Sequence, residues 1–238
     1  MPIGAHRTNV LGSSGGVRSL TTKSIDFESG STQSLNMSLA NFNENGLANA
    51  ATARSWSFWL KKESATAGYV HFDNDGSPAA YINFDTNRLN AFMYDGVSGY
   101  NRTTTATYTD TTAFHHYLIV WDSANATQAD RFRVYVDGTR ITAFDVETAV
   151  PLNTTVAYGG GIGIRIGASL DGLLYDSATF STAVAVNDVY NGGTPPDIRG
   201  LAGLESLLNV DGDNVTGDYV LTAAWTNTNG VTSSTTIP

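Results

Sequence analysis

Residues 114–141 constrain the fold more than any other stretch of this chain, because their side chains alternate with the period of a β-strand. A strand over residues 115–121 would place His116, Leu118 and Val120 on one face and His115, Tyr117, Ile119 and Trp121 on the other. After a polar loop, residues 131–136 alternate in the same way and end at Asp137-Gly138, which supplies the positive φ angles of a tight hairpin. We therefore expect two long antiparallel strands followed by a two-residue turn.

A further strand is expected upstream, over residues 55–62. Its alternation would place Trp56, Phe58 and Leu60 on one face and Ser57, Trp59 and Lys61 on the other. Three large apolar side chains on one face indicate a surface that packs against a second layer of structure. Trp56 and Phe58 are therefore expected to be buried together.

Strand patterns recur about every 8–15 residues between Ser24 and Phe180, separated by short runs rich in Gly, Asn and Asp. The 24 glycines are spread through the chain, which suits many short strands joined by turns. One helix is expected, from Val184 to Asn191, ended by Gly192-Gly193. The fold class that these patterns predict is all-β, a two-sheet antiparallel jelly-roll sandwich.

The order of the motifs resembles a known family. The sequence SWSFWLKK at residues 55–62 is followed by YVDG at residues 135–138, IRIG at residues 164–167 and DGLLYD at residues 171–176. Over roughly residues 24–205, this order resembles the laminin-G-like, concanavalin A-like jelly rolls. Together with the ATQADR loop at residues 126–131, it is most similar to the modules of virion proteins in tailed, especially marine, phages. The resemblance implies the fold and leaves the ligand open.

Composition divides the chain into three parts. Residues 1–23 hold three cations and a Gly-Ser run, so we expect an N-terminal arm that is either disordered or ordered against a neighbouring subunit. Residues 24–196 would form the laminin-G-like sandwich. Residues 197–238 would form a C-terminal extension that packs on the sandwich or on a neighbour. Within it, Tyr219, Leu221 and Ala223 alternate as in a strand that covers a sheet edge.

The formal net charge of −9 argues against nucleic acid as a partner, because phosphate binding needs a clustered cationic surface. The first 20 residues lack the apolar segment of a signal peptide, and no apolar run reaches 18 residues. Neither membrane insertion nor signal-led export is expected. The chain has no cysteine, which excludes disulfides and thiolate metal sites.

Glucanases of the same fold carry a Glu-x-Asp-x-x-Glu strand, and this chain has no such strand. Asp26 and Glu28 form a single pair on one face, and none of the five glutamates is paired at the spacing that the motif requires. The prediction is that the protein is not an enzyme. A glycoside-active enzyme stays the least favoured alternative.

Two loops carry candidate ligand groups. Tyr94, Asp95, Tyr100, Asn101 and Arg102 bracket a turn where a sugar could stack on a ring and hydrogen-bond the polar groups, the alternative being an ordinary hairpin or a subunit contact. Asp73 and Asp75 lie in an oxygen-rich turn that either binds Ca²⁺ or is a plain Asx-turn. Ca²⁺ is the only cofactor left open. His115 and His116 point to opposite faces of a strand and cannot share one metal ion.

The resemblance implies a non-enzymatic structural protein of a phage virion, either a capsid decoration protein or a tail-associated or fibre subunit, assembled in the host cytoplasm. Its expected partners are other virion proteins, bound through the N-terminal arm, and copies of itself, with a trimer favoured by the symmetry of similar phage proteins. The alternative is a carbohydrate-binding, receptor-recognition module for a host surface glycan. Binding that depends on Tyr94 or Tyr100 would separate the two functions.

Overall fold

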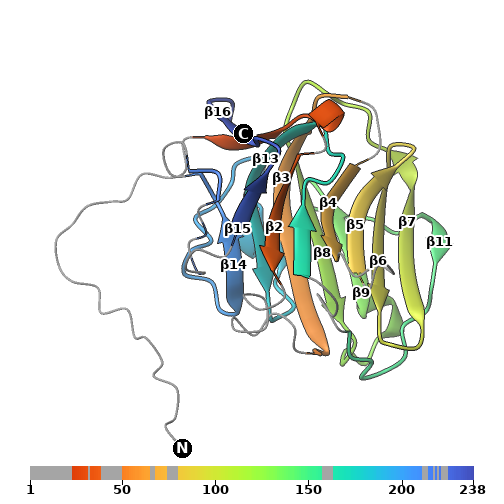
Figure 1. The fold of residues 1–238 in the computed structure, drawn as a ribbon. Coiled ribbons are helices and arrows are strands. Elements are labelled where there is room, and N and C mark those ends of the chain that lie inside the picture. Colours follow the sequence, from red (N-terminus) through yellow and green to blue (C-terminus); the bar gives the residue numbers. More distant parts are fainter. Residues whose placement is uncertain are drawn as a thin grey trace, which may run out of the picture.

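The computed structural model describes residues 23–31, 33–38, 50–64, 68–73, 80–156, 163–210, 214–216, 218, 220 and 225–238. These residues form two antiparallel sheets that pack face to face (Figure 1). The expected all-β, two-sheet sandwich is confirmed. The N-terminal arm, apart from Lys23, lies outside the described residues.

One sheet, here called sheet A, contains the strands predicted over residues 55–62, 115–121 and 131–136. Its order is β10 (Thr139–Arg140), β9 (Phe132–Val136), β8 (His115–Asp122), β3 (Ala53–Lys62), β13 (Gly172–Phe180), β1 (Ser24–Phe27) and β16 (Thr232–Ser234), and β14 (Leu204–Leu208) also pairs with β13. The turn between β9 and β10 has positive φ at Asp137 (48°) and Gly138 (74°). This confirms the predicted tight hairpin.

The other sheet, sheet B, has the order β11 (Phe144–Glu147), β7 (Gly99–Thr107), β6 (Arg88–Tyr94), β5 (Ala80–Asp85), β4 (Gly68–Asp73), β12 (Gly163–Ile166), β2 (Ser34–Ser38) and β15 (Trp225–Thr228). Strands β4 to β7 follow one another along the chain and in space, so side chains on one face lie in rows across the sheet. The candidate site lies along these rows.

Helical structure is limited to single turns in the described part of the chain: η1 (Ser29–Ser31), η2 (Gln128–Asp130) and α2 (Val186–Val189). The helix expected from Val184 to Asn191 is therefore shorter than predicted. Its N-cap residue, Ala185, offers no side-chain cap, and Tyr190 is already extended, with its ring stacked on Trp59 at 5.7 Å. Within the described residues, none of the helices has the length and apolar character needed to cross a membrane.

The main core fills the space between the sheets. Trp56, Phe58 and Leu60 of β3 are at most 1% exposed and pack with Tyr117 and Trp121 of β8. The predicted burial of the Trp56 face is confirmed. The ring of Phe58 stacks on that of Tyr117, with centroids 5.4 Å apart and an interplanar angle of 21°.

A second apolar cluster covers the outer face of sheet A. Its members come from the sheet and from the chain that follows β13: Leu118, Val120, Ala178, Phe180, Val184, Val189, Ile198 and Leu207. The second face of β8 is thus buried as well. Among the described residues no comparable cluster lies over the outer face of sheet B.

The end of the chain pairs with the sandwich itself. Strand β15 pairs with β2, and β16 pairs with β1, so this segment passes from sheet B to sheet A (Figure 1). Trp225 and Val231, 8% and 4% exposed, are part of the main core. The strand expected around Tyr219, Leu221 and Ala223 lies outside the described residues.

Candidate functional site

Three aromatic side chains form a ledge on the outer face of sheet B. Tyr81 of β5 and Phe92 of β6 stack with centroids 5.0 Å apart and an interplanar angle of 16°, and Tyr69 of β4 meets Tyr81 edge-on at 5.9 Å and 87°. All three are partly exposed. Their strand neighbours Ile82 and Ala91 point into the core. We call Tyr69, Tyr81 and Phe92 the aromatic ledge.

Two amides lie beside the ledge in the next row across the sheet. Asn83 of β5 is directly opposite Asn90 of β6, and their side chains are only 9% and 8% exposed. Thr103 Oγ1 donates a hydrogen bond to Asn90 Oδ1 at 3.3 Å, whereas Asn83 Oδ1 has no partner among the described residues. A buried amide with an unpaired acceptor is costly unless something else pairs with it.

Tyr69 and Tyr81 of the ledge line a hollow of about 470 Å³ together with the two amides. Its lining consists of Gly68, Tyr69, Tyr81, Asn83, Asp85, Asn90 and Ser169. Glycine is needed at position 68, because a Cβ there would lie 2.7 Å from Leu170 Cα and from Ser169 O. The close approach of β4 to this turn, held by the bond from Tyr69 N to Ala168 O at 2.9 Å, builds one wall of the hollow. Burial raises the pKa of Tyr81, which therefore stays a neutral phenol.

Sequence reasoning did not predict this hollow, although a signal for it was present. The runs AYINFD and RLNAFMY alternate, and they are joined by Thr86-Asn87, whose φ angles are 51° and 63°. A two-residue turn of this kind fixes the register. Counting back from it places Asn83 opposite Asn90 and Tyr81 opposite Phe92, as observed.

Two of the residues predicted to bind sugar point into the core instead. Tyr100 is 4% exposed, packs against Trp121 at 5.5 Å and donates from its hydroxyl to Asp95 Oδ2 at 2.7 Å. Arg102 is 2% exposed. On β7 the even-numbered residues face inward, so Tyr100 cannot offer the exposed stacking surface that was expected, and Arg102 does not lie on the outer face beside Tyr94.

Asp95 holds the turn together. It accepts hydrogen bonds from Val97 N at 2.7 Å and Ser98 N at 2.5 Å as well as from Tyr100. Burial raises the pKa of Asp95, but these bonds outweigh it and bring the pKa below its ordinary value. Tyr94 and Asn101 lie partly exposed on the outer face, where Asn101 is opposite Phe92. Of the five predicted residues, these two share a face with the ledge.

The structure describes little of the candidate Ca²⁺ turn and places the two neighbouring histidines on opposite faces of β8. Asp73 ends β4, but its side chain and the whole of Asp75 lie outside the described residues. His115 Nδ1 lies 2.6 Å from Asp137 Oδ2, whereas His116 is fully buried on the opposite face, with Nε2 2.9 Å from Ser57 Oγ. Burial lowers the pKa of His116 to about 4.

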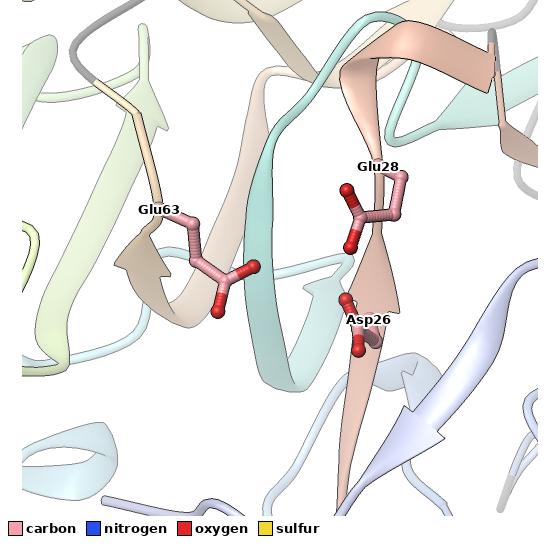
Figure 2. A group of neighbouring side chains, drawn as sticks. All are labelled: Asp26, Glu28 and Glu63. Atoms are coloured by element: carbon pink, nitrogen blue, oxygen red, sulfur yellow. The ribbon is translucent and has the colours of Figure 1, made fainter.

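An acidic cluster was not foreseen. Asp26 of β1 and Glu28, which follows β1, meet Glu63, which follows β3, with carboxylate oxygens within 4.8 Å of one another (Figure 2). Burial raises the pKa of Asp26, and the charges of Glu28 and Asp171 raise it further. Sheet packing thus adds to the pair of Asp26 and Glu28 a third carboxylate, that of Glu63, which lies far from them in the sequence. Oxygen ligands of this kind suit a hard cation such as Ca²⁺.

Solved structures share this fold. A candidate carbohydrate-binding protein from Bacteroides ovatus aligns with a TM-score of 0.60 and 13% identity, covering 90% of this chain and 60% of that one. A native heptameric SAP-like pentraxin from Limulus polyphemus aligns with a TM-score of 0.54 and 13% identity, covering 90% of this chain and 94% of that one. At such identities the likeness shows the fold alone. The chain thus spans 60% of the length of the Bacteroides protein.

Among curated proteins no sequence matches the chain. Residues 29–190 match the family profile described as the concanavalin A-like lectin/glucanases superfamily. The matched range is more than half of the chain and contains β2 to β13 together with α2. The chain therefore belongs to the concanavalin A-like lectin/glucanases superfamily.

Proposed function

We propose that the protein is a carbohydrate-binding module and that neutral sugars bind in the hollow on the outer face of sheet B. The observation that carries this proposal is the hollow itself, where the aromatic ledge adjoins two buried amides. Aromatic rings bind the apolar face of a pyranose, while a few fixed polar groups orient its hydroxyls. The similar Bacteroides protein is itself a candidate carbohydrate-binding protein, which supports the proposal at the level of the fold.

The pairing register of strands β4 to β7 predicts how a bound glycan would be oriented on the sheet. Tyr69, Asn83, Asn90 and Thr103 are consecutive partners across β4, β5, β6 and β7. Neighbouring strands lie about 4.8 Å apart, so this row offers a polar or aromatic group at each such step. An extended glycan would therefore lie across the strands, parallel to the row.

The lining favours neutral sugars over acidic ones. Asp85 is the charged residue among those that line the hollow, and it is exposed. Its carboxylate accepts hydrogen bonds from a pair of hydroxyls but repels the carboxylate of an acidic sugar.

A glycan array followed by titration calorimetry tests this function. Tyr81→Ala should weaken binding of the best neutral glycan about tenfold, since it removes the central ring of the ledge. Tyr94→Ala is the matched comparison, because Tyr94 is on the same face but outside the lining of the hollow. Loss of binding in Tyr94→Ala and not in Tyr81→Ala would place the site at the β6–β7 loop and contradict the proposal.

We propose binding without hydrolysis. The chain lacks the Glu-x-Asp-x-x-Glu strand, and the acidic cluster of Asp26, Glu28 and Glu63 belongs to sheet A, whereas the hollow belongs to sheet B. A glycosidase needs its two carboxylates on either side of the bound glycosidic bond. Reducing-end release from a bound glycan that disappears in Asp26→Asn would overturn this part of the proposal.

For the setting, we propose display on a phage virion, on the strength of the sequence resemblance of residues 114–141 to virion modules. Attachment through residues 1–23 and a trimeric assembly belong to the same proposal. Since β15 and β16 pair within their own chain, such a trimer would need other surfaces than the edges of β1 and β2. A chain that starts at Ser24 should stay folded and lose incorporation into particles; incorporation equal to that of the full chain would contradict the anchor.

A further inference from the structure

Arg102 is a buried cation at the inner face of β7. Its guanidinium lies 5.3 Å from the ring of Phe132 and 5.4 Å from that of Phe144, and its side chain is 2% exposed. Nη1 donates to Thr148 O at 2.7 Å and to Asn101 O at 3.3 Å. These contacts hold the guanidinium plane in one orientation.

The charge of Arg102 is only loosely compensated. Nη2 lies 3.2 Å from Glu147 Oε1, but the Glu147 side chain is 54% exposed. Nε of Arg102 has no hydrogen-bond partner within the described part of the chain. Burial lowers the pKa of Arg102 and the charge of Glu147 raises it. A buried cation of this kind is stabilised by a well-placed carboxylate, and Glu147 supplies that contact from a solvent-exposed position.

Arg102 lines a hollow of about 320 Å³ together with Gln128, Ala129, Glu147 and Ala149. This hollow is separate from the sugar hollow, because none of its lining residues is shared. Arg140 lies close by, with Nη2 donating to Ala129 O at 2.6 Å and Nη1 paired with Asp130 Oδ1. The charge of Arg140, which is paired with Asp130, also acts on Arg102 and lowers its pKa.

We propose that this second hollow binds an acidic sugar, a hexuronate, whose carboxylate takes the place of Glu147 beside Arg102. A guanidinium presents paired donors that match the two oxygens of a carboxylate. The Gln128 amide, exposed at the rim, can donate to and accept from ring hydroxyls, and the small side chains of Ala129 and Ala149 leave room for the ring. The volume is at the lower end of small-molecule sites, which suits one monosaccharide.

The experiment titrates the full chain with glucuronate, glucose and acetate at equal ionic strength, and follows the amide resonances of Gln128 and Ala129. Glucuronate should shift both resonances in a saturable manner. Glucose should have no effect, and acetate should bind about tenfold more weakly, because it lacks the hydroxyls that reach Gln128. Equal responses to glucose and glucuronate, or to acetate and glucuronate, would overturn the proposal.

Two variants test the exchange of carboxylates. Glu147→Gln removes the competing charge and should tighten glucuronate binding about two- to fivefold, the range of an exposed ion pair. Asp145→Asn is the matched control, since it makes the same charge change on the same strand, where Asp145 pairs with Arg88. Gln128→Ala, at an exposed position, should weaken binding at least threefold, as expected for the loss of about one hydrogen bond, with the melting temperature unchanged. If Glu147→Gln and Asp145→Asn bind glucuronate with equal affinity, the glucuronate carboxylate does not take the place of Glu147, and the proposal is contradicted.

Discussion

Phe58 shows how a single buried ring holds the two sheets together. It lies on β3 in sheet A and contacts both Tyr117 of β8 and, at 6.1 Å, the ring of His71 on β4 in sheet B. Phe58→Ala should therefore cost about 3–5 kcal/mol of the free energy of unfolding, because it empties a large site between rigid neighbours. Denaturant melts measure this, and a loss below about 1 kcal/mol would mean that the site collapses or that Phe58 is not central.

The acidic cluster predicts an unusual pH dependence. The pKa values of Asp26 and Glu63 are raised, so the folded state keeps protons that the unfolded state has released. Their contribution to stability therefore falls as the pH rises from about 4 through the raised pKa values. Glu28→Gln removes one repelling charge and should raise the melting temperature at pH 7, with a smaller gain near pH 4.

The matched control for the cluster is Asp188→Asn, which removes one exposed carboxylate elsewhere. Both variants change the net charge equally, so the difference between them reports the local repulsion. Equal melting temperatures of the two variants at pH 7 would contradict the account. A gain in the wild-type melting temperature on adding Ca²⁺, absent in Glu28→Gln, would show a cation in the cluster.

At the scale of elements, the C-terminal strands close one side of the sandwich. Removing residues 225–238 would expose the edges of β1 and β2 and the cavity left by Trp225 and Val231. We expect a loss of more than about 3 kcal/mol in denaturant melts, together with association at micromolar concentration, because unpaired edges recruit other strands.

Removing only residues 237 and 238 is the control for the truncation, since these residues are exposed and lie beyond Thr236, whose carbonyl accepts a hydrogen bond from Ser24 Oγ at 2.8 Å. The longer truncation should differ clearly from it in both stability and light scattering. A chain without residues 225–238 that stays monodisperse and as stable as the control would show that β15 and β16 add little to the sandwich.

The elements differ in how far the sequence predicts them. Alternation identified β3 and β8, and the Asp137-Gly138 turn identified its hairpin, because both signals are local. Alternation alone does not say which face of a strand looks inward, and on β7 the aromatic Tyr100 face is the buried one. Glu63 joins Asp26 only through strand order in sheet A, which no local pattern contains.

At the scale of the whole molecule, the two outer faces have different roles. The chain after β13 covers the outer face of sheet A with a second apolar cluster. The outer face of sheet B instead presents rings, amides and a hollow. Sequence motifs predicted the sandwich because its strands follow the order seen in the family. They did not predict which outer face stays exposed to solvent, because that depends on where the chain after β13 packs.

The most direct test of the central claim is to map the bound glycan by NMR. With the best neutral oligosaccharide, backbone and side-chain amide shifts should cluster on Tyr69, Tyr81, Asn83, Asn90 and Phe92, and the side-chain amide of Asn83 should shift most because its acceptor gains a partner. Residues of the β6–β7 loop, including Val97, should be unaffected. Shifts confined to that loop, or spread over sheet A with none on Asn83 and Asn90, would contradict carbohydrate binding on the outer face of sheet B.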